Sequence, residues 1–200
     1  WNFIMKDLII VVADSYQEKV IEALLPRVPV VSGTRVFTYD IIRNISNDAG
    51  SYNTSHELLR PYIHEYRQAI VVFDYEGCGV EFTHTREEIE AEVERLLSIN
   101  GWDDRTTAIV ISPEVENWMW VENPNVDQAI GWERNETLYE WGRTNGLIAH
   151  GDTKPLRPKE TLEKALRVAG TSKSSAIYKK IAQTVSYKKC QDPAFIKLIQ

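Results

Sequence analysis

The sequence predicts an α/β protein with a mostly parallel sheet flanked by helices, followed by a helical C-terminal part. Three short apolar runs, at residues 7–13, 69–74 and 107–112, are rich in β-branched residues, as is typical of strands buried on both faces. Helical sequence separates each run from the next and is long enough to form a crossover. We therefore expect the three strands to be parallel neighbours in one sheet.

Strands and helices alternate between the first and second of these runs. Residues 16–25 carry apolar side chains on one face and end at Pro26, which predicts a helix. The Val- and Ile-rich stretches 28–31 and 36–42 predict one or two further strands.

The middle of the chain is expected to supply the connecting helices. Residues 44–53 are polar and indicate a loop, whereas residues 55–68 have the apolar spacing of a helix that leads into the strand at 69–74. Residues 85–88 then form a capping box, and the apolar stripe that follows predicts a helix ending near Gly101. We interpret the run of glutamates on this helix as a solvated face.

Beyond Trp118 the sequence predicts helices and no strands. Residues 159–168 and 174–185 have helical patterns. Asp192 and Pro193 have the residue types of a helix N-cap and first helical position, so they should open a last helix.

We divide the chain into an α/β core at residues 1–121 and a helical, basic part at residues 122–200 that should pack on the core. Four of the six tryptophans lie close to this boundary. Such a cluster usually forms core packing between short helices, which we favour over stacking on nucleic-acid bases. The four residues are Trp118, Trp120, Trp132 and Trp141.

Composition indicates a globular protein of the cytoplasm. The hydrophobic fraction of 43% and charged fraction of 26% are ordinary, no apolar run approaches the length of a membrane helix, and no signal peptide is evident. Cys78 and Cys190 are far apart, which suits a reducing compartment and offers no disulfide or zinc framework. Because the sequence opens at Trp1, we expect either a native start at Met5 or a longer chain before it.

Carboxylates follow each of the three predicted strands. Asp14 follows the first, Asp74 and Glu76 follow the second, and Glu114 and Glu116 follow the third. Because ligands bind at the carboxyl edge of a parallel sheet, we expect these acids to share a site. Clustered acids repel one another unless a cation neutralises them, and Mg²⁺ prefers carboxylate oxygens. The alternative is that Asp74 and Glu76 only solvate a loop and cap the next helix.

Positive charge is concentrated near the C-terminal end. Residues 154–190 contain ten Lys or Arg and two Glu, a net charge of +8, so the remaining residues carry −14 of the total of −6. Such a segment either binds a polyanion or matches the acidic body internally, and composition does not separate these alternatives. If nucleic acid binds, the expected contacts are Lys154, Arg157, Lys159, Lys179 and Lys180.

The acidic turn after the second strand resembles a known motif. Asp74-Tyr75-Glu76-Gly77-Cys78-Gly79 has the spacing of the Asp-x-Asp-x-x-Gly motif of TOPRIM domains in topoisomerases, primases and nucleases, with Glu in place of the second Asp. Residues 14–18, Asp-Ser-Tyr-Gln-Glu, resemble the first acidic motif of that domain, with Asp for Glu and Ser for Gly.

A closer likeness is to a family of TOPRIM-like proteins associated with bacterial anti-phage defence systems, including a methylation-associated one. This resemblance implies a TOPRIM-like, Rossmann-like sheet and other defence-system proteins as partners. It covers stretches across nearly the whole chain: residues 71–79, 101–102, 112–118, 154–155, 158–160 and 190–195.

Two functions follow from the residues and the resemblance. The first is a nuclease that depends on Mg²⁺ or Mn²⁺, in which Asp14, Asp74 and Glu76 bind the metal. Asp14 and Glu116 are its expected catalytic groups, with Glu116 completing the cluster or transferring a proton. The second is a non-catalytic TOPRIM-like module that binds nucleic acid, a nucleotide or a partner protein in a defence complex. The departures from the motif at Asp14 and Ser15 favour the module, and the acids at every strand end favour the enzyme.

Overall fold

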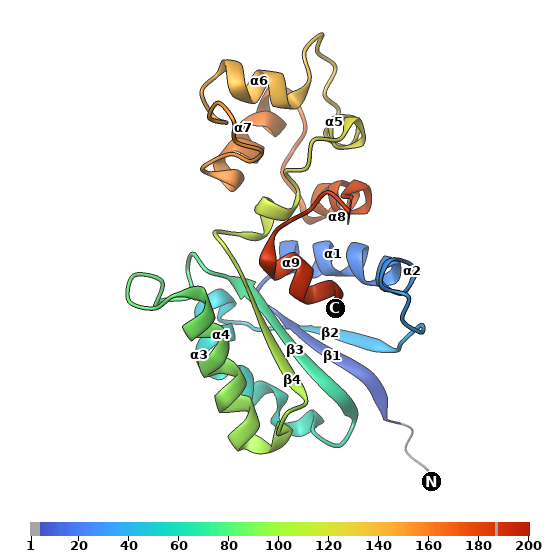
Figure 1. Cartoon of the computed structure of the whole chain (residues 1–200), viewed down its shortest axis with the longest axis vertical. Helices are drawn as coiled ribbons and strands as arrows, with labels where there is room; N and C mark the ends of the chain where they lie inside the picture. The colour runs from blue at the N-terminus through green and yellow to red at the C-terminus, as the bar shows by residue number, and fades with distance from the viewer. Residues whose placement is uncertain (1–4, 187) are drawn as a thin grey trace. The chain divides into compact units, whose positions relative to one another are not determined.

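A computed structural model describes residues 5–186 and 188–200 (Figure 1). The expectation about the start of the chain concerns residues 1–4, which lie outside this description. The chain forms two compact units, which are described separately. Their bounds differ from the predicted division into residues 1–121 and 122–200. The sheet unit is Trp1–Glu18 with Gly33–Ser112, and the helical unit is Lys19–Ser32 with Pro113–Gln200.

The sheet unit is built on four parallel strands in the order β2-β1-β3-β4 (Figure 1). The predicted neighbours are confirmed, because β1 pairs with β3 and β3 pairs with β4, both in parallel. The strands are β1 (Lys6–Val12), β2 (Tyr39–Arg43), β3 (Tyr66–Asp74) and β4 (Thr106–Ile111).

The strand order reverses at β1, which has β2 on one side and β3 on the other. In open parallel sheets the ligand crevice lies at such a switch point, outside the carboxyl ends of the strands. Val12 of β1 is in register with Val72 of β3. Asp14 and Asp74 each stand two positions beyond this pair, so the fold brings both acids to the switch point.

One face of the sheet is covered by α3 (Asn47–Leu59) and α4 (Arg86–Leu97). The two helices share a face because the β2→β3 and β3→β4 crossovers run in the same direction and right-handed crossovers then place their helices together. Leu59 of α3 and Ile89 and Leu97 of α4 pack there in one core. Strand residues of the same core include Ile9, Val11, Val71, Phe73 and Val110.

The predicted capping box of α4 is confirmed at Thr85 and Glu88. Its glutamates, however, are not all solvated. Glu90 and Glu94 accept hydrogen bonds of 3.0 and 2.9 Å from the backbone N–H groups of Val110 and Ala108. Because β4 is the edge strand of the sheet that the described residues form, its outward N–H groups face no further strand there, and these carboxylates satisfy them.

Three sequence-based assignments in the β1–β3 region are wrong. Residues 28–31 lie in α2 (Val28–Ser32), not in a strand, because a short apolar run does not distinguish the two and Pro29 suits a first helical turn. The polar stretch 44–53 is not a loop but largely helix, since α3 begins at Asn47. The helix expected at 55–68 instead ends at Leu59, apart from the turns at Arg60–Tyr62, and β3 begins at Tyr66.

The helical unit contains no strand among its described residues, which the sequence predicted for the part beyond Trp118 but not for residues 28–31. It includes most of α1 (Ser15–Leu24), which begins in the sheet unit. The four clustered tryptophans are each at most 8% exposed, which confirms core packing. The other helices and short turns of the unit are η1 (Leu25–Arg27), α2, η4 (Val115–Trp118), α5 (Pro124–Ile130), α6 (Leu138–Thr144), α7 (Pro158–Val168), α8 (Ser175–Thr184) and α9 (Pro193–Ile199).

Asp192 is the N-cap of α9 and Pro193 its first residue, as the sequence predicts. In the sheet unit, α4 continues into η3 (Ser98–Trp102), where Gly101 has a φ of +102°.

Among the helices that the structure describes, none combines the length and the apolar character needed to cross a bilayer.

Candidate functional site

Asp14 caps the helix that follows β1. Its Oδ1 accepts hydrogen bonds of 2.8 Å from the backbone N–H groups of both Tyr16 and Gln17. This is the geometry of an N-cap, in which one carboxylate oxygen satisfies free N–H groups of the first turn. Both of these bonds use Oδ1, so capping is compatible with metal binding through Oδ2.

Asp48, in the first turn of α3, is the site residue that the sequence analysis missed. Its Oδ1 accepts a hydrogen bond of 2.8 Å from the backbone N–H of Asp74 and one of 3.1 Å from Nε2 of Gln17. The buried Gln17 side chain in turn accepts a bond of 3.0 Å from the backbone N–H of Ala13. This network ties the ends of β1 and β3 to the start of α3.

The charges of these acids act on one another. Burial raises the pKa of Asp48, and the negative charge of Asp14 raises it further. The hydrogen bonds from the Asp74 N–H and from Gln17 oppose this shift but do not outweigh it. The charge of Asp14 thus acts on Asp48, an acid that was not among the predicted site residues.

Asp74 ends β3 and is 9% exposed. A buried carboxylate is costly unless opposite charge or hydrogen bonds compensate it. With Asp14 and Asp48 beside the same strand ends, the site offers carboxylate oxygens, the ligands that Mg²⁺ and Mn²⁺ prefer.

Glu76 lies exposed in the turn after β3. This turn is shaped by Gly77 and Gly79, whose φ angles of +94° and +93° favour glycine. Their N–H groups donate to the carboxylate of Glu81 at 3.2 and 2.7 Å. Hydrogen bonds from the backbone N–H of Glu81 itself and from these glycines lower the pKa of Glu81. The carboxylate of Glu81 therefore stabilises this turn through hydrogen bonds, and Glu76 is exposed in the turn.

Glu114 and Glu116 belong to the helical unit, where both are buried. A carboxylate oxygen of one lies within 4.8 Å of a carboxylate oxygen of the other. Lys159 Nζ donates to Glu114 at 2.5 Å, and the Tyr178 hydroxyl donates to Glu116 at 2.6 Å. Burial, aided by the charge of Glu114, raises the pKa of Glu116, which suits a group that exchanges protons.

The five basic residues predicted to bind nucleic acid occur in three different settings. Arg157, Lys159 and Lys179 form ion pairs with Glu160, Glu114 and Glu22, all inside the helical unit. Lys154 donates to the backbone oxygen of Asn117 at 2.7 Å, and Lys180 is exposed. Internal charge matching thus accounts for three of these side chains, and nucleic-acid binding stays a prediction.

In the sheet unit, Asp14 follows β1, Asp74 ends β3, Asp48 accepts a hydrogen bond from the backbone of Asp74, and Glu76 is exposed in the adjoining turn. The sequence signal for Asp48 was weak, because α3 buries Gly50, Ser51 and Ser55 and so lacks an apolar stripe. No protein-family model, curated protein or solved structure matches this chain.

Proposed function

We propose that the sheet unit binds Mg²⁺ or Mn²⁺ through Asp14, Asp74 and Glu76 and uses it to hydrolyse phosphodiester bonds in nucleic acid. The observation that carries this proposal is the parallel register of β1 and β3, which brings Asp14 and Asp74 to the switch point of the sheet. The resemblance of residues 74–79 to the TOPRIM motif supports the same chemistry and favours a role in bacterial anti-phage defence, alongside other defence-system proteins.

Carboxylate oxygens such as those of Asp14, Asp74 and Glu76 are the ligands that a hard cation prefers. A divalent ion bound there would stabilise negative charge on the attacking and leaving oxygens of a phosphodiester. Asp48 holds the backbone of Asp74 and thereby positions its carboxylate. Glu116 belongs to the helical unit, and its role in proton transfer stays a prediction.

Replacing Asp74 tests the proposal. Asp74→Asn should abolish Mg²⁺- or Mn²⁺-dependent cleavage of DNA and RNA while leaving the far-ultraviolet circular dichroism spectrum unchanged. Divalent ions should raise the melting temperature of the parent protein but not of this variant, because a ligand stabilises only the state that binds it. Asp104→Asn is the matched control, since Asp104 is exposed and precedes β4, at the opposite end of the strands.

The outcomes separate the functions that the residues allow. Cleavage that survives Asp74→Asn would place the activity elsewhere. Stabilisation by metal without cleavage of any nucleic acid would favour the non-catalytic binding module. If no metal changes the melting temperature of either protein, the metal site itself is wrong.

A further inference from the structure

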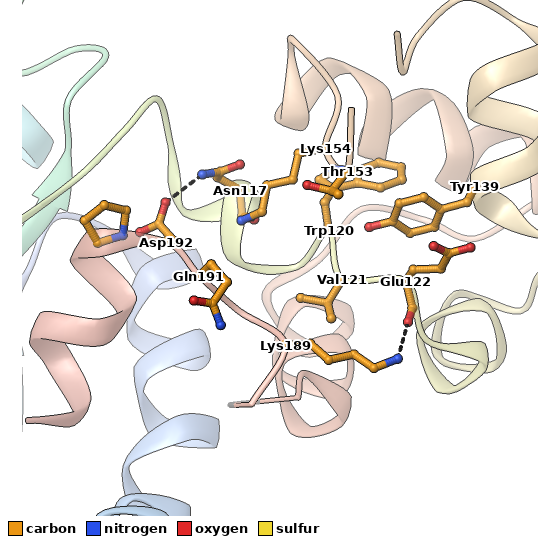
Figure 2. A pocket seen from close by; sticks show the side chains of 11 residues that line it. Asn117, Trp120, Val121, Glu122, Tyr139, Thr153, Lys154, Lys189, Gln191 and Asp192 are labelled. Atoms are coloured by element: carbon orange, nitrogen blue, oxygen red, sulfur yellow. Dashed lines mark hydrogen bonds between the residues drawn. The ribbon is translucent and has the colours of Figure 1, made fainter. Parts of the chain in front are cut away.

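The helical unit contains a pocket with a volume of about 530 Å³ (Figure 2). Its wall is formed by residues from the η4 turn and the segment after it, from α6, and from the segments before α7 and α9. This volume lies within the roughly 300–1,000 Å³ typical of sites for small molecules and cofactors.

The hydroxyl group of Tyr139 is directed into this pocket (Figure 2). Tyr139 is 3% exposed, and its hydroxyl has no hydrogen-bond partner among the residues that the structure describes. A buried hydroxyl without a partner is costly, so its presence calls for an explanation. Burial raises the pKa of Tyr139, which keeps the hydroxyl protonated and able to donate.

Two lysines in the wall differ from the paired lysines of the same unit. Lys154 donates to the backbone oxygen of Asn117 at 2.7 Å, and Lys189 donates to that of Glu122 at 3.1 Å. Carbonyl oxygens are neutral, so these bonds orient the ammonium groups without cancelling their charge. Each ammonium has three donors, which leaves capacity for an anionic ligand.

The carboxylates of the wall have different roles. Asp192 accepts from the Trp118 indole at 2.9 Å and from the Asn117 amide at 2.8 Å, in addition to capping α9. Glu122 is exposed, its carboxylate lies near the Tyr139 ring, and its backbone oxygen accepts from Lys189 (Figure 2). A carboxylate in such a place suits the hydroxyl groups of a ribose, which donate hydrogen bonds to acids in nucleotide sites.

An aromatic wall completes the pocket. The rings of Trp120 and Tyr139 are in edge-to-face contact with centroids 5.9 Å apart. The Trp120 indole N–H donates to the backbone oxygen of Pro158 at 2.9 Å, which fixes the ring. A planar base gains from contact with such rings.

We propose that this pocket binds a mononucleotide. Lys154 and Lys189 hold the phosphate group, Glu122 accepts hydrogen bonds from the ribose hydroxyls, and the base lies against Trp120 with a hydrogen bond from Tyr139. Cationic, acidic and aromatic groups in one pocket of this volume match the three parts of a nucleotide. This site belongs to the helical unit and does not depend on the metal site of the sheet unit.

Calorimetry with the full chain tests this proposal. The probes are AMP, GMP, CMP and UMP at low salt in the presence of a chelator, with the corresponding nucleosides and inorganic phosphate for comparison. At least one monophosphate should bind, and its nucleoside should bind at least about tenfold more weakly, because it lacks the phosphate group that the two lysines would hold.

Matched variants separate specific binding from general attraction to positive charge. Lys154→Gln and Lys189→Gln should each weaken binding about tenfold or more, whereas Lys188→Gln should not, because Lys188 does not line the pocket. Tyr139→Phe should weaken binding without lowering the melting temperature of the ligand-free protein, since its hydroxyl has no partner among the described residues. Asp74→Asn should bind the nucleotide normally.

Three results would overturn the proposal. The first is that no monophosphate binds at millimolar concentration. The second is that inorganic phosphate binds as tightly as any nucleotide, which would reduce the pocket to an anion site. The third is that Lys188→Gln weakens binding as much as Lys154→Gln.

Discussion

Asp48 links the ends of β1 and β3, yet its own charge is disfavoured where it lies. One carboxylate oxygen receives hydrogen bonds from Asp74 and Gln17, and both bonds would persist with an amide oxygen in its place. Burial and the charge of Asp14 raise its pKa above the reference value of 3.8. Asp48 therefore links the strand ends through Oδ1 as a hydrogen-bond acceptor. Its negative charge destabilises the folded state unless a cation is nearby.

Asp48→Asn should make the metal-free protein at least as stable as the parent at pH 7. A carboxyl whose pKa is raised on folding stabilises the protein below its unfolded pKa, and this contribution is lost as the pH rises through the folded pKa. The advantage of Asn should therefore shrink as the pH falls toward 4. Thermal melts from pH 4 to 8 in chelator measure it. A variant that melts several degrees below the parent at pH 7 would show that the ionised form stabilises the fold.

The sequence predicted part of the site. Asp14 and Asp74 were predictable because each ends a β-branched run, and parallel strands bring their carboxyl ends to one edge. Asp48 was not, because it lies on a helix that faces the sheet with small polar residues. The surroundings of Glu116 were not predictable either, since its hydrogen-bond donor, Tyr178, comes from a distant part of the chain.

Secondary-structure elements show the same dependence on distant partners. Helix α4 supplies the acceptors that the edge strand β4 lacks, through Glu90 and Glu94. Exposed edges invite pairing with other chains, and covering them is a common remedy. The sequence pattern of this helix showed only a charged face, because the strand it protects follows later in the chain.

Removing the Glu90 carboxylate should weaken this edge. Glu90→Ala should reduce the free energy of unfolding by about 1–3 kcal/mol, because it leaves the N–H of Val110 without its acceptor. Glu90→Gln keeps an acceptor oxygen and should cost less. Urea denaturation measures both variants, and light scattering reports any association through the edge. If Glu90→Ala and Glu90→Gln reduce the free energy of unfolding equally, then the charge of Glu90 stabilises the edge and the hydrogen bond to Val110 does not.

The strands were easier to predict than the connections between them. β1, β3 and β4 are buried and β-branched, and that composition is a strong local signal. Helix α3 has no such signal. Gly50 faces the side chain of Asn44 so closely that an added Cβ would lie 2.3 Å from Asn44 Oδ1. The inward positions of this stretch are thus occupied by small residues such as Gly50 and Ser51 in place of apolar side chains, so residues 44–53 resemble a loop when read alone.

At the scale of the whole molecule, the helical unit is assembled from two separate pieces of chain, Lys19–Ser32 and Pro113–Gln200. Arg27 from the first piece donates to the backbone oxygens of Gln183 and Val185 at 3.0 and 2.8 Å. These carbonyls lie at the C-terminal end of α8, where helices carry free acceptors. Glu22, also from the first piece, forms an ion pair with Lys179 of α8, with 2.9 Å between Oε2 and Nζ. The basic segment is thus partly neutralised by acids within its own unit.

A fragment of residues 113–200 should therefore not fold cooperatively on its own. It lacks the segment that caps α8 and that contributes the buried side chains of Ile21, Leu24 and Leu25. Circular dichroism of this fragment should show reduced helix content and a broad thermal transition. A synthetic peptide of residues 15–32 added in trans should restore a sharper transition.

The capping arginine provides the control for that experiment. The same peptide with Arg27→Ala should restore the transition less well, because the carbonyl groups at the end of α8 lose their charged donor. A peptide with Arg35→Ala, extended to residue 36 and compared with its extended parent, should act like that parent, because Arg35 pairs with Asp7 of the sheet unit. If residues 113–200 alone unfold as sharply and at the same temperature as the full chain, then the N-terminal piece is not needed for the helical unit to fold, and the two-piece division is wrong as a description of folding.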